Sequence, residues 1–245
     1  MQALAGTGIA GAAVSRHEGE ARDPDTRRLL YREEHLVRHE GDAPSERLVL
    51  YRCPDRTAFA RKRVDYRRSR LAPEFELVDA RGHREGLRRE GARTLVWSGD
   101  APPRALAATE MPLVADAGFD EFLRMRWTVL TAGEPQRLAF AVPAYGRSLN
   151  FRIAPKAGSG PAPGAMQRFE LRIDGMLGRM FPGITVDYDR EDRRLQRFLG
   201  VTNIRDAQGD QVRAEILFPR RPQPADDRLW QAAGAEPLVA CRLGG

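Results

Sequence analysis

The chain is poor in cysteine, in lysine and in long apolar runs, and each shortage excludes a class of protein. Only 2 of its 245 residues are cysteine, so a dense disulfide network does not hold the fold together. No run of about 18 apolar residues occurs, which leaves no candidate for a membrane-spanning helix. Hydrophobic residues still make up 42% of the chain, which is too many for a disordered protein. A globular protein with a substantial core remains, as one large domain or two small ones.

The two cysteines, Cys53 and Cys241, lie almost a whole chain apart. In a reducing compartment they are two ordinary thiols, and in an oxidising one they can form a bridge. The sequence leaves both alternatives open. Neither cysteine has the Cys-x-x-Cys or Cys/His spacing of a zinc site, and no cofactor or metal is expected.

The net charge of +6 comes almost entirely from arginine, because Lys62 and Lys156 are the only lysines. Acidic residues interrupt nearly all the arginine clusters, as Asp65 and Glu74 do, which is typical of a solvated surface. No stacking aromatics or nucleic-acid-binding signature accompany the clusters, so nucleic acid is not an expected partner. The same charge favours contact with an anionic membrane surface.

Residues 1–15 are small and apolar, and the chain turns abruptly charged at Arg16. The stretch Ala10-Gly11-Ala12 has the small-x-small pattern of a signal-peptidase site. We interpret it as the end of a secretory signal peptide, which predicts a periplasmic or secreted protein. The alternative is a flexible Ala/Gly leader. Both interpretations predict that residues 1–25 are disordered, ahead of a β domain over residues 26–220 and a C-terminal extension over residues 221–245.

Hydrophobic residues recur with a period of two from residue 26 onward, the pattern of strands with one buried face. Apolar and charged residues alternate without error over residues 168–174, and nearly so over 184–189 and 212–218. Turn-forming residues separate these segments at short intervals, which favours antiparallel strands over βαβ units. About a dozen twisted strands cannot form a flat sheet. The predicted fold is therefore mainly β (α+β), a strongly curved antiparallel sheet or half-barrel in one domain.

One segment, at about residues 117–131, has the period of an amphipathic helix instead. Asp116 is the expected N-cap of this helix, and Gly133 marks its end. The helix is expected to plug the concave face of the sheet. Its apolar stripe consists of Phe119, Phe122, Leu123, Trp127 and Leu130.

The bulky residues placed for the interior are the candidate binding residues for an apolar ligand. Such a ligand would occupy space that the side chains leave free inside the curved sheet; the alternative is a completely filled core. The candidates for this apolar cavity are Trp97, Phe122, Trp127, Phe140, Phe151, Phe169, Leu171, Tyr188 and Phe198.

No catalytic constellation is recognisable, and the protein is not expected to be an enzyme. None of the serines lies in a Gly-x-Ser-x-Gly motif. His35 and His39 lie four residues apart on a predicted strand, which separates their rings by about 13 Å, too far to share one metal ion. They are expected to be exposed histidines, with no catalytic residue and no metal ligand among the candidates.

Several strings in the chain resemble a family of uncharacterised proteobacterial exported proteins. These strings are YREEH at residues 31–35, YRCPDRTAFARK at 51–62, PEFEL at 73–77, and the segments 184–206 and 214–219. Members of that family have no assigned function. The plan of curved sheet and helix also looks like that of the carrier proteins that shuttle lipoproteins to the outer membrane.

This resemblance implies a periplasmic protein that binds a lipid or a lipidated partner. The first hypothesis is a non-enzymatic binding or carrier protein for such an apolar ligand. The second is an interaction or structural module of the cell envelope with a filled core, and the third is a hydrolase of unknown class.

Overall fold

The computed structural model describes residues 13–156, 165–175, 178 and 183–241, and their dominant element is one large sheet. Its strands are β1 (Ala13–Arg22), β2 (Leu29–Glu40), β3 (Ala43–Arg52), β4 (Ala58–Asp65), β5 (Glu74–Asp79), β6 (Arg84–Glu90), β7 (Arg93–Ser98), β8 (Arg104–Ala105), β9 (Leu113–Val114), β10 (Gln136–Val142), β11 (Arg147–Lys156), β12 (Met166–Ile173), β13 (Ile184–Asp189), β14 (Leu195–Arg205), β15 (Gln211–Leu217) and β16 (Gln223–Ala225). The helical elements are α1 (Gly118–Met125), α2 (Trp127–Thr131), α3 (Asp227–Ala235) and the 3-10 turn η1 (Pro143–Tyr145).

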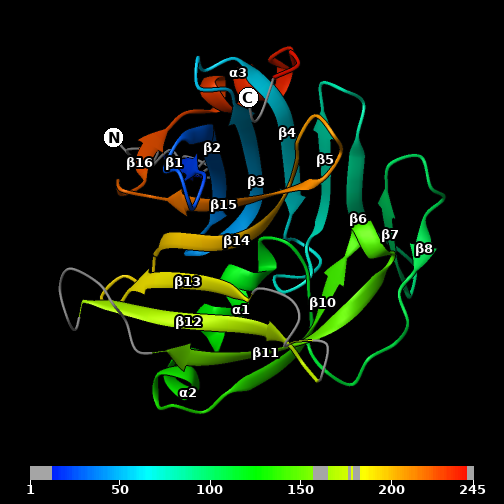
Figure 1. Ribbon diagram of the computed structural model, residues 1–245, viewed down its shortest axis with the longest axis vertical. Coiled ribbons are helices and arrows are strands. Elements are labelled where there is room, and N and C mark those ends of the chain that lie inside the picture. Colours follow the sequence, from blue (N-terminus) through cyan, green and yellow to red (C-terminus); the bar gives the residue numbers. More distant parts are fainter. Residues whose placement is uncertain (1–12, 157–164, 176–177, 179–182, 242–245) are drawn as a thin grey trace, which may run out of the picture.

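The sheet is built from two meanders that meet at β1 (Figure 1). Its strand order is β8-β7-β6-β5-β4-β3-β2-β1-β15-β14-β13-β12-β11-β10-β9, and β16 pairs with β1 beside this path. All neighbours are antiparallel except β9 and β10. The path does not close between β8 and β9, so the sheet is an open, curved one and not a closed barrel. The mainly β, strongly curved antiparallel fold expected from the sequence is thereby confirmed.

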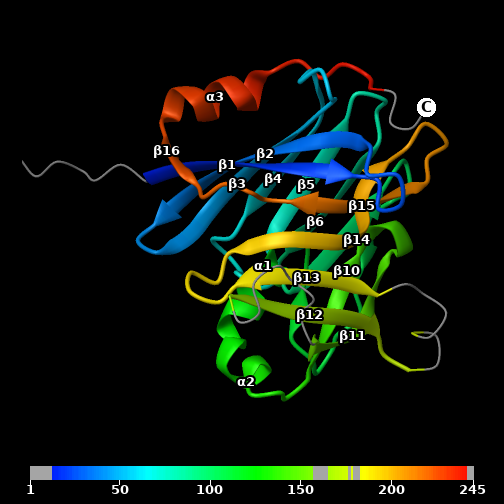
Figure 2. The ribbon, with the colours of Figure 1, turned by 60° about the vertical axis from the view of Figure 1, so that its left-hand side comes forward.

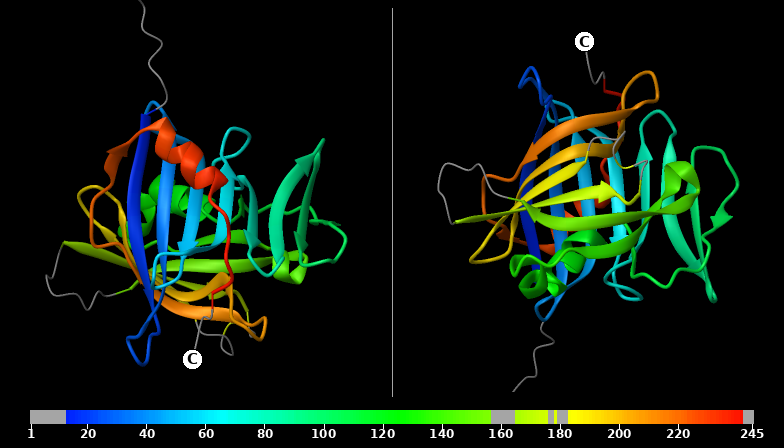
Figure 3. Two further views of the ribbon diagram at one scale, coloured as in Figure 1. Left: turned by 90° about the horizontal axis from the view of Figure 1, so that it is seen from above. Right: turned by 60° about the horizontal axis from the view of Figure 1, so that its bottom comes forward.

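Curvature brings the two meanders to face each other across a common concave side. Figures 2 and 3 show β1 to β6 as one wall and β10 to β14 as the other. Strand twist accumulates over so many neighbours, so the sheet coils instead of spreading flat.

The predicted helix is present but bends at Arg126, which separates α1 from α2. Helical hydrogen bonds continue through the bend, from Arg126 N to Phe122 O and from Leu130 N to Arg126 O. The buried stripe packs against strands β10 to β13 and thus covers part of the concave face. This packed cluster consists of Val114, Phe122, Leu123, Trp127, Leu130, Leu138, Ile153, Phe169, Leu171, Val186 and Tyr188.

The prediction of a disordered leader up to residue 25 is wrong for residues 13–25, while residues 1–12 lie outside the described part. Residues 13–22 form β1, which pairs along its length with β2 and also with β15 and β16. Few apolar side chains of this segment are buried, chiefly Val14 and Ala21. Backbone hydrogen bonds to neighbours on both sides order it instead, and side-chain hydrophobicity does not report such pairing.

The C-terminal segment packs on the convex side of the first meander (Figure 2). Asp226 caps α3 by accepting a hydrogen bond from Leu229 N. Trp230 and Ala233 of α3 then cover an apolar patch on the outer face of the sheet. That patch consists of Val14, Leu36, Leu48, Leu50 and Ala58.

A disulfide between Cys53 and Cys241 fastens the chain beyond α3 to the end of β3. Their Cα atoms lie 5.9 Å apart, within the range that a disulfide spans. The alternative of two separate thiols therefore does not describe this structure. No helix in the described ranges is long and apolar enough to cross a membrane.

Candidate functional site

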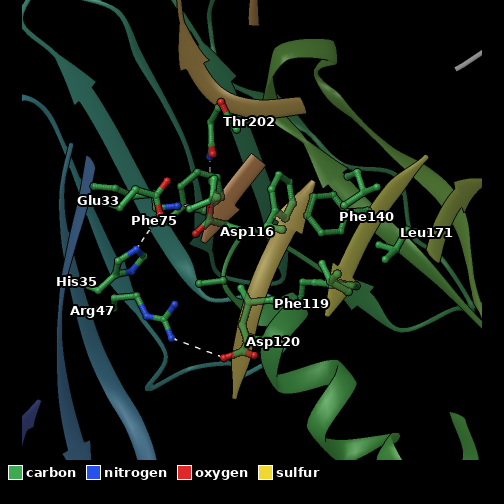
Figure 4. A pocket seen from close by; sticks show the side chains of 18 of the residues that line it. Glu33, His35, Arg47, Phe75, Asp116, Phe119, Asp120, Phe140, Leu171 and Thr202 are labelled. Carbon is green, nitrogen blue, oxygen red and sulfur yellow. Dashed lines mark hydrogen bonds and ion pairs between the residues drawn. The ribbon is translucent and has the colours of Figure 1, made fainter. Parts of the chain in front are cut away.

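The concave face of the sheet encloses a cavity of about 800 Å³. Strands β1 to β6 line one side, β10 to β15 line the other, and the start of α1 lies between them. Figure 4 shows a division inside the cavity: charged side chains gather around Glu33, His35 and Arg47, and apolar ones around Phe140 and Leu171.

The apolar end is formed by aromatic and aliphatic side chains of the second meander. Phe140 contacts Phe119 of α1 and Phe151 of β11 edge-to-face, with ring centroids 6.5 and 5.9 Å apart. Two-residue alternation along these strands turns such side chains toward the concave side. Further apolar lining residues are Leu149, Leu171, Ile173, Ile184, Val186 and Phe198.

The structure divides the nine residues predicted to bind an apolar ligand into two groups. Five of them line the cavity: Phe140, Phe151, Leu171, Tyr188 and Phe198. Phe122, Trp127 and Phe169 lie in the packed cluster around the helices, where the rings of Trp127 and Phe169 are 5.6 Å apart. Trp97 lies on β7, with its ring 5.5 Å from the guanidinium carbon of Arg88. That any of them binds a ligand stays a prediction.

The charged end, which the sequence analysis did not predict, is carried by the first meander. Glu33, His35, Arg47 and Lys62 line the cavity from β2, β3 and β4. His35 pairs with Val49, and Val49 pairs with Lys62, so the side chains of these residues project on one face of the sheet. Polar and apolar side chains alternate along these strands as regularly as elsewhere. Here the polar side chains face inward, because α3 covers the apolar ones on the outer face.

Glu33 and His35 form a buried hydrogen-bonded pair, with 2.8 Å between Oε2 and Nε2. Burial, and to a lesser extent the charge of Asp116, raises the pKa of Glu33 to about 7. Burial and the nearby Arg47 and Lys62 hold the pKa of His35 well below its usual value. Near neutral pH the imidazole is therefore uncharged and the carboxyl group is partly protonated. His35 was expected to be exposed; that prediction is wrong, because its strand face is the interior of the sheet.

A second histidine ring lies against this pair. His17 of β1 stacks on His35 with 4.6 Å between ring centroids and an angle of 14°. Burial, together with His35 and Arg47, lowers the pKa of His17 to about 2. Both imidazoles are thus neutral, and they form a hydrogen-bonding surface without charge.

Asp116, the expected helix N-cap, has a different role. Its backbone takes a positive φ of 43°, Ala117 occupies the cap position, and no side chain caps α1. The Asp116 carboxylate instead accepts hydrogen bonds from Lys62 Nζ at 2.7 Å and Asn203 Nδ2 at 3.1 Å. Burial opposes its ionisation, but Lys62 and Asn203 outweigh burial and lower the pKa of Asp116.

Asp120 of α1 has three partners, one from each wall and one from its own helix. The hydroxyl of Tyr188 donates a hydrogen bond to Oδ1 at 2.9 Å, and Arg124 approaches Oδ2 to 3.0 Å. Arg47 lies farther away, with 3.9 Å between its Nη2 and Oδ2 of Asp120. The helix thereby joins the charged end of the cavity to the second meander.

One serine and one histidine of the cavity wall lie within hydrogen-bond distance. Ser15 Oγ is 3.1 Å from His39 Nε2. No ion pair joins His39 to a carboxylate in the described part of the chain, so the third member of a triad is missing there. No group of three or more histidine, cysteine or acidic side chains is placed to hold a metal ion within the described residues.

Fold and site together define an open β half-barrel with an internal cavity that is charged at one end and apolar at the other. No family model matches the chain, and no curated protein matches it. Among solved structures, it is similar to the crystal structure of a β-barrel-like protein of the domain of unknown function DUF1849 from Brucella abortus. The TM-score is 0.45 at 9% sequence identity, over 88% of this chain and 98% of that one.

Proposed function

We propose that this protein is a non-enzymatic binding or carrier protein for a lipid or a lipidated partner. The cavity of about 800 Å³ supports this function, because ligand sites are commonly concave, largely apolar and of this size. Each methylene group of a ligand that enters the apolar end gains about 0.8 kcal/mol from leaving water. A single hydrocarbon chain in that end would therefore be bound firmly without any covalent chemistry.

The two other hypotheses have less support. A structural module of the cell envelope needs a filled core, whereas here the side chains of the two walls leave a continuous space. A hydrolase would use Ser15 and His39, and in the described part no ion pair joins His39 to an orienting carboxylate.

We further propose a periplasmic or secreted location. The Cys53–Cys241 bridge favours an oxidising compartment. The small-residue pattern at Ala10-Gly11-Ala12 is consistent with export.

A variant that fills the apolar end tests the binding function. Leu149 lines the cavity, and Leu149→Trp adds bulk inside it. The matched control is Leu229→Trp, since Leu229 lies in α3 on the convex side. Native mass spectrometry of protein purified without detergent should show a co-purifying lipid mass in the parent and in the control. Displacement of the neutral fluorescent probe N-phenyl-1-naphthylamine measures the same site in solution.

The expected result is that Leu149→Trp loses the lipid mass and binds the probe at least about tenfold more weakly. A parent protein that carries no lipid and binds no probe would contradict the proposed function. Equal binding by both tryptophan variants would place the ligand somewhere other than this cavity.

A further inference from the structure

We propose that the ligand of the cavity is an amphiphile with an anionic head group, a carboxylate or a phosphate, and that Arg47 binds this group. The inference rests on the proposed function, because the hydrocarbon chain of the same molecule would occupy the apolar end.

Arg47 projects from β3 into the charged end of the cavity. It pairs with Val37 of β2 in the sheet, and Val37 pairs in turn with Ser15 of β1. All three residues line the cavity, so they share its concave face. Figure 4 shows the Arg47 guanidinium between His35 and Asp120, directed into the space. Its side chain is only 15% exposed.

The guanidinium lacks the close partners that a buried charge usually has. Among the described residues its single ion pair is the 3.9 Å approach to Asp120, and its Nε has no hydrogen-bond partner. The ring centroid of Tyr66 lies 5.9 Å away. The neighbouring cation Lys62, by contrast, is 2.7 Å from Asp116. Arg47 therefore keeps several of its five N–H donors for a ligand.

Burial lowers the pKa of Arg47, but the charges of Asp120, Asp116 and Glu121 raise it. Each of these acids already has another cationic partner, which for Glu121 is Arg70 at 2.9 Å. Asp120 is already held by Arg124 and Tyr188, and Asp116 by Lys62 and Asn203. Glu33 has a pKa of about 7, so its carboxyl group is largely protonated and uncharged below that pH. The remaining buried acid of the lining, Glu85, is on β6, and β4 and β5 separate that strand from β3.

Other arginines strengthen the positive field at this end. Arg124 and Arg194 line the same cavity, and after burial and His35 the charges of Arg47, Arg194 and Arg124 help to lower the pKa of His17. A planar guanidinium matches the two oxygens of a carboxylate or phosphate, with which it forms short, parallel hydrogen bonds.

Consecutive residues of α1 mark the boundary between the two ends. Phe119 packs against Phe140 at the apolar end, and Asp120 faces Arg47 at the charged end. A molecule with a hydrocarbon chain and one anionic group thus finds both complements within a single cavity.

The test compares ligands that share one sixteen-carbon chain and differ in the head group. Delipidated full-length protein is titrated with hexadecanoate, hexadecyl phosphate, hexadecanol and hexadecyltrimethylammonium, each displacing N-phenyl-1-naphthylamine. Inorganic phosphate alone is the fifth ligand. The variants are Arg47→Gln, which keeps the shape without the charge, and Arg197→Gln as the control. Arg197 has its ion pairs with Glu215 and Asp187 outside the cavity.

We expect the two anions to bind at least about tenfold more tightly than hexadecanol, as loss of a hydrogen bond to a charged group implies. Arg47→Gln should remove this preference and leave hexadecanol binding unchanged, and Arg197→Gln should change neither. Equal affinity for hexadecanoate and hexadecanol, or an Arg47→Gln variant that retains the preference for anions, would overturn this inference but not the proposed function. Failure of every long-chain ligand would instead overturn the proposed function. If the protein binds inorganic phosphate but none of the long-chain ligands, Arg47 binds a free anion, and the inference of an amphiphilic ligand is wrong.

Discussion

Replacing Glu33 with glutamine is expected to stabilise the protein at alkaline pH. Burial raises the pKa of Glu33 from 4.5 to about 7 in the folded state. The folded protein therefore binds more protons than the unfolded chain between these values, and its stability falls as the pH rises through this window. At about 1.4 kcal/mol per pH unit, the ionised carboxylate costs the fold about 3 kcal/mol above pH 7. The Glu33 side chain is 9% exposed, so solvent screens it little.

The adjacent Glu34 is a matched control with the opposite sign. Its side chain faces the convex side, where Arg16 and Arg52 donate hydrogen bonds of 2.6 and 2.8 Å to its carboxylate. Burial opposes the ionisation of Glu34, but these hydrogen bonds outweigh it and lower the pKa. Glu34 therefore contributes stability above its unfolded pKa, and this stability is lost as the pH falls through the folded pKa.

Urea unfolding followed by tryptophan fluorescence at about pH 5 and about pH 8 measures both effects. Glu33→Gln should exceed the parent by about 3 kcal/mol at the higher pH and by much less at the lower one. Glu34→Gln should lose about 1–3 kcal/mol near neutral pH, the cost of removing a hydrogen-bonded charge. The reasoning is refuted if Glu33→Gln and the parent show parallel pH dependence, or if Glu33→Gln is the less stable protein at about pH 8.

Two further predictions concern the C-terminal segment. Replacing Cys53 and Cys241 with alanine should lower the free energy of unfolding by about 2–4 kcal/mol, because the long loop between them is no longer closed in the unfolded chain. Urea unfolding measures this loss, and a parent protein whose stability does not change with reductant would contradict the prediction. Trp230→Ala should lower the free energy of unfolding by about 3 kcal/mol, because it uncovers the outer patch. The control Met125→Ala, at a residue that is 61% exposed, should change it by no more than about 0.5 kcal/mol. Equal thermal unfolding midpoints for the two variants would exclude a structural role for α3.

The class of fold could be predicted because hydrophobic periodicity reports it directly. Alternation over residues 168–174 and 184–189 corresponds to β12 and β13, which are neighbours in the sheet. The stripe from Phe119 to Leu130 corresponds to α1 and α2, with a bend at Arg126 that the stripe does not encode. Long-range pairing was the missing information at the N-terminus. β1 is ordered by strands from both ends of the chain, and its own residues carry little sign of this.

The apolar end of the cavity was largely predictable, and the charged end was not, for one physical reason. Alternation separates the two faces of a strand but does not say which face is inside. On β11 to β13 the convex face is polar, so the apolar set marks the interior. On β2 and β3 the apolar set does not mark the interior, since Leu36, Leu48 and Leu50 face outward beneath Trp230 of α3.

That inversion gives the site its chemistry. When α3 covers the convex side of β2 and β3, the polar set of those strands must face the concave side, as Glu33, His35 and Arg47 do. None of the helices in the described ranges packs on the outer side of the opposite wall, which directs Phe140 and Phe151 into the same space. One curved sheet, covered on part of its outer face, thereby acquires a cavity with a charged wall opposite an apolar wall. The C-terminal helix thus determines which side chains a ligand would meet, although none of its residues lines the cavity.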